Sequence, residues 1–461
     1  MSDATAVATV LCAVRGVREA EVVTMLDAPG LQVTRRCADV VELLAAAAAG
    51  AGRVAVVSCD LPSFDREAVA DLRAHGVRVV ALAPSGTWEE GRLRAFGVDA
   101  VVDLASSPDE LRDVVRSVAP ARRPDEAGPT DPGRGVPTGP TAPGAVPHDG
   151  RLVAVWGPTG APGRTTLALN LAAELAGPAP AGRRARPSRR DRRAAEVDVP
   201  ATAPAGPEAE VLLVDADTYG GTVAQRLGLL DESPGLAAAV RSAGQGALDA
   251  SGLVALAPSV VPRLQVLTGV ARAARWPELP GVSLDAVWDV ARTVADWTVV
   301  DCGFGIERDE LLTYDTRAPQ RNDATLSALA AADVVVVVGA GDPVGLQRLV
   351  RALDDLGESG VAVAAVRAVV VNRVRSSVVG PRPERAVRDA MARYAGVEDL
   401  HVVPEDRALD VALREGRTLA EVAPGSAARR AIARVAAQVR ETTPARAPRG
   451  AAHGHVLETA H

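Results

Sequence analysis

Short apolar runs alternate with amphipathic segments over the first quarter of the chain. They predict strands at residues 7–11, 31–34, 53–58, 77–82 and 100–104. A repeated strand–helix order is typical of a parallel sheet that is covered by helices on both faces. We therefore expect residues 1–119 to form an α/β domain with a (βα)5 arrangement.

A second α/β pattern begins at Leu152. Its apolar runs are almost continuous, which suits strands that are buried on both faces of a parallel sheet. They predict strands at residues 152–156, 211–215, 264–267, 297–301, 333–338 and 368–372. Residues 151–440 are therefore expected to form a second α/β domain with a mostly parallel sheet.

Three stretches interrupt these patterns. Residues 120–150 are rich in Pro, Gly, Asp and Thr, which predicts a flexible linker. Residues 177–210 are rich in Pro, Ala and Arg and predict a low-complexity insert. Its arginine cluster is either a solvated loop or a site for an acidic partner or lipid headgroups. Residues 441–461 are expected to be a disordered tail.

The composition narrows the classes of function. A net charge of −7 over 461 residues argues against a globally basic nucleic-acid binder. No charge-free apolar run reaches the roughly 18–20 residues of a membrane span. The chain begins Met-Ser-Asp-Ala-Thr, without the basic start of a secretory signal, so a cytoplasmic location is expected. Isolated buried thiols, without disulfide or zinc spacing, are expected at Cys12, Cys37, Cys59 and Cys302.

The segment GPTGAPGRTT follows the first expected strand of the second domain. It resembles a phosphate-binding loop, G-x-x-x-x-G-K-[ST], with Arg164 in place of the lysine. Thr165 is placed to ligate Mg²⁺, and Thr166 follows it. All 51 basic residues of the chain are arginine, so a compositional bias of the source genome is an alternative explanation for Arg164. Backbone N–H groups can surround an anion at the turn permitted by Gly157, Gly160 and Gly163.

Two further apolar runs end in carboxylates. Asp215 and Asp217 follow one run, and Asp301 ends the other just before Cys302 and Gly303. Ligands of open α/β sheets bind outside the carboxyl ends of the strands. Asp215 and Asp301 are therefore candidate Mg²⁺ ligands, with Asp301 acting through water.

A third apolar run ends in Asn372, and HVVPED, residues 401–406, is expected to be a loop. A strand-end amide and a proline-containing loop suit the binding of a nucleotide base. Asn372, Pro404 and Asp406 are the candidate residues for that contact.

With these motifs in this order, residues 151–440 resemble the MinD/ParA class of P-loop ATPases, whose loop has the form K-G-G-x-G-K-[ST]-[ST]. The two lysines of that pattern fall on Thr159 and Arg164. Its second glycine falls on Ala161, and Pro162 removes a backbone donor. The resemblance implies a homodimer that binds ATP or ADP with Mg²⁺, in which Asp217 orients the attacking water.

The replaced lysines affect binding and hydrolysis differently. Arg164 keeps a positive charge near the phosphates, so nucleotide affinity is expected to survive. Phosphoryl transfer depends on placing that charge accurately, so hydrolysis is expected to be slow or absent. The residues expected to act in any hydrolysis are Asp217 and Arg164.

The first domain resembles a response-regulator receiver that has lost its chemistry. Its first strand runs into Cys12-Ala-Val-Arg15, without the acidic pair of that family. The position of the phosphorylated aspartate in receivers falls on Ser58, two residues before Asp60. The position of the receiver lysine falls near Leu104. We expect a docking module that is not phosphorylated on Asp60.

A degenerate receiver joined to a MinD/ParA-like domain resembles the CpaE/TadZ group and its actinobacterial septum-site-determining relatives. This implies a cytoplasmic positioning protein, recruited to a pole or septum, whose receiver-like domain meets pilus, secretion or cell-division proteins. The alternatives are a nucleotide-independent scaffold and a chromosome-partition ATPase that binds DNA nonspecifically. An iron–sulfur reductase is disfavoured because Cys302 has no partner cysteines at cluster spacing.

The partition alternative needs a basic surface, and two segments offer one. They are the arginines of residues 183–193 and a segment that carries Arg429, Arg430, Arg434 and Arg440. The apolar face of that second segment is expected to pack in the core rather than to bind a membrane. That face consists of Ala428, Ile432, Val435 and Ala436.

Overall fold

A computed structural model describes residues 7–16, 18–119, 150–177, 209–229, 234–308 and 319–442. Nearly all of the expected linker and insert and most of the tail lie outside these ranges. Residues 441 and 442, which were assigned to the tail, instead end the last described helix. None of the described helices is both long enough and apolar enough to span a membrane.

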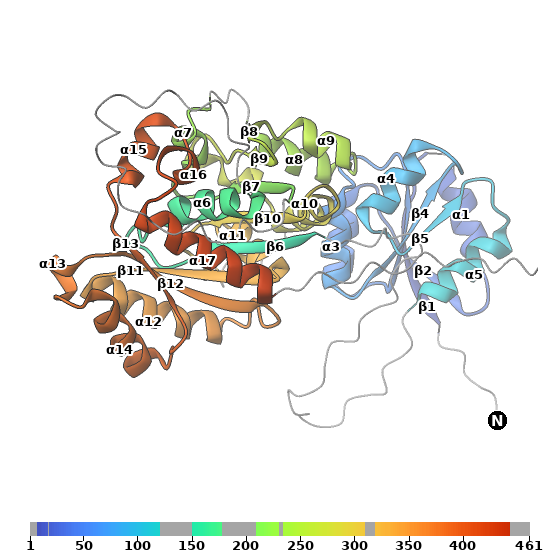
Figure 1. The fold of residues 1–461 in the computed structure, drawn as a ribbon. Coiled ribbons are helices and arrows are strands. Elements are labelled where there is room, and N and C mark those ends of the chain that lie inside the picture. The colour runs from blue at the N-terminus through green and yellow to red at the C-terminus, as the bar shows by residue number, and fades with distance from the viewer. Residues whose placement is uncertain are drawn as a thin grey trace, which may run out of the picture.

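The first domain is a parallel sheet between two helical layers (Figure 1). Its strands, in the sheet order β2-β1-β3-β4-β5, are β1 (Ala8–Ala13), β2 (Leu31–Arg36), β3 (Val54–Ser58), β4 (Arg78–Ala83) and β5 (Ala100–Asp103). Its helices are α1 (Arg18–Leu26), α2 (Val40–Ala48), α3 (Arg66–Ala74), α4 (Trp88–Phe96) and α5 (Pro108–Val118). Helices α1 and α5 cover one face, and α2, α3 and α4 cover the other. This is the doubly wound order 2-1-3-4-5.

The second domain is built on a sheet of order β13-β12-β11-β6-β10-β7-β9-β8, in which the pair β8–β9 is antiparallel and every other pair is parallel. The strands are β6 (Arg151–Trp156), β7 (Val211–Ala216), β8 (Ser259–Val261), β9 (Leu264–Leu267), β10 (Trp297–Cys302), β11 (Val334–Ala340), β12 (Val366–Val374) and β13 (His401–Pro404). The expected α/β fold with a mostly parallel sheet is confirmed. Strand β13 corrects the expectation of a loop over residues 401–406, because its apolar residues pair with β12.

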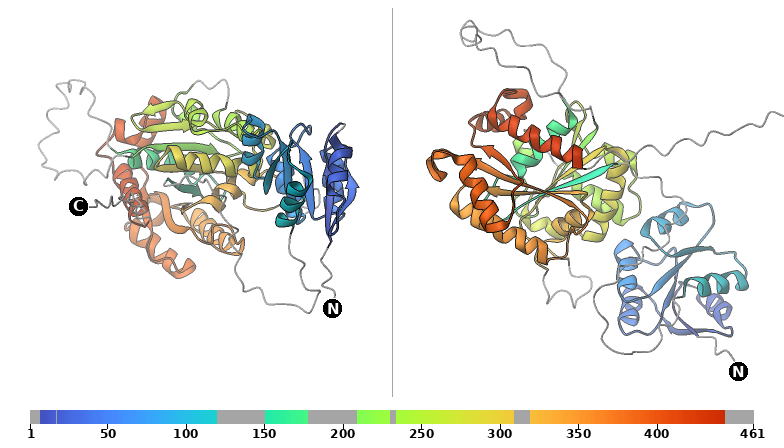
Figure 2. Two further views of the ribbon diagram at one scale, coloured as in Figure 1. Left: turned by 90° about the vertical axis from the view of Figure 1, so that its right-hand side faces the viewer. Right: turned by 60° about the horizontal axis from the view of Figure 1, so that its bottom comes forward.

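Helices cover both faces of this sheet (Figure 2). One face packs against α8 (Gly235–Gly244), α9 (Ala250–Ala255), α10 (Gly281–Val294), α11 (Asp323–Ala331), α12 (Pro343–Glu358) and α14 (Pro383–Ala395). The other packs against α6 (Arg164–Ala176), α7 (Val223–Arg226), α15 (Ala408–Glu415), α16 (Leu419–Val422) and α17 (Ala427–Thr442). The short elements η2 (Ala273–Glu278) and α13 (Ser376–Val379) complete the described helices.

The two domains meet where α3 packs on α10 (Figure 1). Burial lowers the pKa of Arg66, at the start of α3, and the carboxylates of Asp289 and Asp285 on α10 oppose that shift. The two domains also approach closely at Gly246, where an added Cβ would lie 3.0 Å from the carbonyl oxygen of Arg92. The first domain therefore docks on the second through the α3 and α4 side of its sheet.

Candidate nucleotide-binding site

The phosphate-loop segment and the three aspartates meet at one edge of the second sheet. Strand β10 lies between β6 and β7, and its Asp301 pairs in register with Val155 of β6 and Asp215 of β7. All of these pairs are parallel, so the strands end at the same edge, where residues 157–163 lead into α6. The sequence prediction that these segments come together is confirmed.

The loop backbone requires left-handed residues at three positions. Gly160 and Gly163 have φ of 100° and 98°, which glycine adopts freely. An added Cβ at Gly163 would lie 2.3 Å from the Asn372 side-chain nitrogen. Ala161 has φ of 54°, at a cost of roughly 1 kcal/mol for a residue with a Cβ. The loop therefore keeps the conformation of a glycine at a position where alanine stands.

Gly157 packs closely against a neighbouring strand. The general loop spacing needs a glycine five residues before Gly163, and Pro158 stands there. A Cβ at Gly157 would lie 2.1 Å from the carbonyl oxygen of Val338 in β11. Gly157 therefore stands one residue before the first glycine position of that spacing, and its small size allows close packing against β11.

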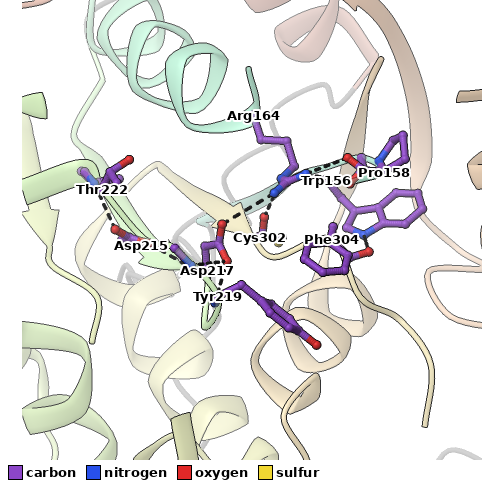
Figure 3. A network of polar contacts seen from close by, with 12 residues as sticks. Trp156, Pro158, Arg164, Asp215, Asp217, Tyr219, Thr222, Cys302 and Phe304 are labelled. Atoms are coloured by element: carbon purple, nitrogen blue, oxygen red, sulfur yellow. Dashed lines mark hydrogen bonds and ion pairs between the residues drawn. The ribbon is translucent and has the colours of Figure 1, made fainter. Parts of the chain in front are cut away.

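The Arg164 side chain folds back across the loop (Figure 3). Its Nε donates to the Cys302 carbonyl at 3.1 Å, and its Nη1 donates to the carbonyls of Gly157 at 3.1 Å and Pro158 at 2.8 Å. Nη2 lies 3.6 Å from Oδ2 of Asp217, and both side chains are about nine-tenths buried, with 11% and 8% exposed. Nη2 accordingly keeps N–H groups that can bind an anion at the loop.

Asp217 organises the backbone that follows β7. Its Oδ1 accepts from the backbone N–H groups of Tyr219 at 2.9 Å and Gly220 at 3.2 Å (Figure 3). Asp215 is buried beside it and accepts from Val223 and Asp217 N–H groups. Burial, opposed by the Val223 hydrogen bond, raises the pKa of Asp215 to about 7, and the neighbouring Asp217 charge adds to the rise.

Asp301 has the fewest hydrogen bonds of the three aspartates at this edge. Its side chain is fully buried, and within the described residues neither carboxylate oxygen has a hydrogen-bond partner. Burial raises its pKa well above the ordinary value, the Asp215 charge raises it further, and the Thr165 side chain lowers it. A buried carboxylate without a partner, beside a hydroxyl and two more carboxylates, is a donor set that suits Mg²⁺. The metal assignments of Asp301, Asp215 and Thr165 therefore fit the geometry.

Three of the remaining predicted residues, Thr166, Asn372 and Asp406, form hydrogen bonds with other residues of the protein. Thr166 accepts a hydrogen bond from Nη1 of Arg226 at 3.1 Å, and buried Asn372 donates to the Pro162 carbonyl at 2.9 Å. Asp406 accepts from the backbone N–H groups of Ala408 and Ala428 and so joins the starts of α15 and α17. Asn372 thus positions the loop, and Asp406, two residues after Pro404, positions two helices.

An aromatic cluster beside Asp217 was missed in the sequence. The Tyr219 ring packs against the Phe304 ring at an interplanar angle of 36° with centroids 4.4 Å apart, and the Arg321 guanidinium lies 4.0 Å from the Tyr219 ring centroid. Trp156 donates its ring N–H to the Phe304 carbonyl at 3.2 Å (Figure 3). The chain has few aromatic residues. Tyr219 and Phe304 each follow a strand end that carries an aspartate, and this placement was the signal in the sequence for the cluster.

The corresponding edge of the first domain lacks a comparable site. Ser58 is buried and its hydroxyl accepts from the Arg15 backbone N–H at 3.2 Å. The Arg15 guanidinium donates to the backbone carbonyl of Asp60 at 3.4 Å, and the Asp60 side chain is exposed. Asp103 ends β5 and accepts from the backbone N–H groups of Ser85 and Ala105.

The basic helix weighed for DNA or membrane binding is α17. All four residues of its predicted apolar face are buried, so the expectation of core packing is confirmed. Arg429 pairs with Glu174 at 2.7 Å, and Arg440 donates to backbone carbonyls at the end of α6. Of its four arginines, Arg430 and Arg434 are exposed.

No protein-family model and no curated protein matches the chain. Similar solved structures include the cell-division ATPase MinD of Pyrococcus furiosus, 19% identical, with 64% of this chain and 100% of that chain covered and a TM-score of 0.45. A ParA family ATPase from Chlorobium tepidum is 18% identical, covering 62% and 98%, with a TM-score of 0.46. The septum site-determining protein MinD of Pyrococcus horikoshii, complexed with Mg-ADP, is 18% identical, covering 63% and 96%, with a TM-score of 0.43. At these identities and TM-scores, the likenesses carry no argument for a shared function.

Proposed function

We propose that residues 151–440 bind ATP or ADP with Mg²⁺, and that nucleotide binding controls a dimer or scaffold. The observation that carries the proposal is the buried Asp301 carboxylate without a partner, next to a loop crossed by the Arg164 guanidinium. A bound cation would neutralise the acids, and a phosphate would accept from Nη2 of Arg164 and from loop N–H groups.

Slow hydrolysis is part of the proposal. Three N–H donors of Arg164 are already bonded to carbonyls, and its remaining nitrogen faces Asp217. An Asp217 carboxylate paired in this way is held away from orienting water. Mg²⁺, when bound, would supply charge stabilisation at the phosphates, while these residues bind and orient the nucleotide.

In the cell, we propose a positioning role of the MinD/ParA kind, with a homodimer that localises septum, pilus or secretion machinery. The CpaE/TadZ arrangement supports this role because a (βα)5 domain without an acidic pair docks on the P-loop domain. The face of that domain covered by α1 and α5 lies opposite the docked α3 and α4 side and is proposed to meet the partner protein.

The proposal is tested by calorimetric titration of ATP and ADP, with Mg²⁺, into the full chain, while light scattering follows the mass. We expect micromolar binding that is accompanied by dimerisation. In Arg164→Ala, affinity should fall about a hundredfold, because a charge-assisted hydrogen bond is worth up to about 3 kcal/mol. Arg164→Lys should bind and keeps the charge as the matched control.

A nucleotide-independent scaffold is the second candidate, and the Arg164–Asp217 pair favours it because that pair partly neutralises the loop without a ligand. Absence of binding in the native chain, with binding in Arg164→Lys, would support the scaffold and reject the nucleotide switch. The partition alternative has less support, because Arg429 and Arg440 of α17 are bonded to α6. DNA retention that falls steeply with added salt would support it.

A further inference from the structure

A second arginine reaches the phosphate loop from the side opposite the aspartates. Arg348 belongs to α12, which follows β11, and β11 adjoins β6 on the side away from β10. An added Cβ at Gly160 would lie 2.0 Å from Nη1 of Arg348 and 3.2 Å from its Cζ. The Arg348 guanidinium therefore lies against the backbone of the loop, in the space that the absent Gly160 side chain leaves open.

Arg348 has no polar partner among the described residues, in contrast to Arg164. Its side chain is exposed, and among the described residues it takes part in no hydrogen bond or ion pair. Arg164 instead bonds three carbonyls and faces Asp217. A guanidinium with all of its N–H groups free beside an anion-binding turn is suited to a phosphate group.

The distribution of charge around the loop favours a second cation on its β11 side. Asp215, Asp217 and Asp301 gather on one side of the loop, and Arg164 is directed toward them. Thr159, one residue before Gly160, carries no charge that could offset a polyphosphate. The loop is thus flanked by acids with one arginine on the β10 side and by a free arginine on the β11 side.

We propose that Arg348 binds a phosphate group of the nucleotide held by its own chain, as the second cation of the loop. This inference rests on the proposed nucleotide binding and adds a binding residue to it. The guanidinium acts on the polyphosphate and not on the base, so its effect is shared by inorganic tripolyphosphate.

The test uses the full chain and titrates Mg²⁺-ATP and Mg²⁺-tripolyphosphate into the native protein, Arg348→Ala and Arg351→Ala. Arg351 lies on the same helix, is also exposed, and has no hydrogen bond or ion pair to another described residue, so it is a matched control. Arg348→Ala should weaken both ligands about tenfold, the loss expected for one charge-assisted contact. Arg351→Ala should change either affinity by less than about twofold.

Each outcome separates the two proposals. A native chain that binds neither ligand overturns the proposed function together with this inference. Native binding that is unchanged in Arg348→Ala, or that falls equally in Arg351→Ala, overturns the inference and leaves nucleotide binding standing. Weakening confined to ATP would assign Arg348 to the nucleoside and reject the phosphate contact.

Discussion

Both sheets have acidic residues at strand ends, and the pKa values of these acids are shifted in opposite directions in the two domains. In the first domain, hydrogen bonds from the side chain of Ser85 and the backbones of Ala105 and Ser85 lower the pKa of Asp103. In the second, burial raises the pKa of Asp215 to about 7 and that of Asp301 well above its ordinary value. The first edge satisfies its own acid with hydrogen bonds, whereas among the described residues at the second edge the buried Asp301 carboxylate has no hydrogen-bond partner. An acid at a strand end indicates a binding site when the protein leaves it unsatisfied.

The largest expected effect is an opposite pH dependence of the two domains. A raised folded-state pKa gives stability that is complete below about pH 4 and is lost as pH rises toward about 7 for Asp215. The free energy of unfolding of the second domain should therefore fall between pH 5 and pH 8, by a few kcal/mol, roughly 1.4 per pKa unit. Asp103, with a lowered pKa, contributes stability that is lost on acidification.

Hydrogen–deuterium exchange of peptides from β10 and β5, corrected for the intrinsic pH dependence of exchange, measures both domains in one sample. Saturating Mg²⁺-ATP should remove most of the loss at pH 8, because the cation neutralises the buried acids. Protection of β10 that increased from pH 5 to pH 8 without ligand would contradict the raised pKa of Asp215 and Asp301.

Asp301→Asn should give the next largest effect. Removing a buried charge without a partner should stabilise the ligand-free chain at pH 8 by about 2 kcal/mol. The same change should remove the Mg²⁺ dependence of ATP affinity. The matched change Asp103→Asn in the first domain should destabilise, because its carboxylate already accepts two backbone hydrogen bonds. Urea unfolding and calorimetry measure both variants, and destabilisation by Asp301→Asn would refute a metal role.

The sequence was sufficient for the acids and for the strands other than β8 and β13, because buried parallel strands read as continuous apolar runs with their polar residues at the ends. It was insufficient where contacts join distant segments. Asn372 and Pro162 are 210 residues apart, and nothing local shows that the amide bonds the loop carbonyl. Arg348 looked like any surface helix residue, because its closeness to Gly160 is set by the order of β11 and β6 in the sheet.

Asp217→Asn is expected to have an intermediate effect. The substitution removes the carboxylate that competes with phosphate for Arg164, so ATP affinity should rise about fivefold, which corresponds to about 1 kcal/mol for this long ion pair of 3.6 Å. Any hydrolysis should be lost at the same time. Calorimetry and phosphate release measure the two effects, and weaker binding would show that Asp217 helps to bind the nucleotide.

Ala161→Gly should have a smaller effect. It relieves the left-handed strain at φ of 54°, and the greater freedom of glycine in the unfolded chain offsets part of the gain. A net stabilisation of about 0.5 kcal/mol is expected. Urea unfolding followed by tryptophan fluorescence suits this test, because four of the five tryptophans lie in the second domain. Destabilisation would mean that the Ala161 methyl group contributes packing of its own.

The smallest expected effect concerns phosphorylation of the first domain. A phosphoryl donor should leave the mass of the chain unchanged. Ser58 stands at the end of β3, bonded by the Arg15 backbone, and Asp60 lies two residues beyond with an exposed side chain. Without an acidic pair to hold Mg²⁺, the carboxylate of Asp60 has no means of stabilising a transferred phosphoryl group. Incubation of the full chain with acetyl phosphate and Mg²⁺, followed by intact-mass measurement, should show no added phosphate. An adduct lost in Asp60→Asn would show instead that this edge keeps its chemistry and would remove the contrast between the two domains.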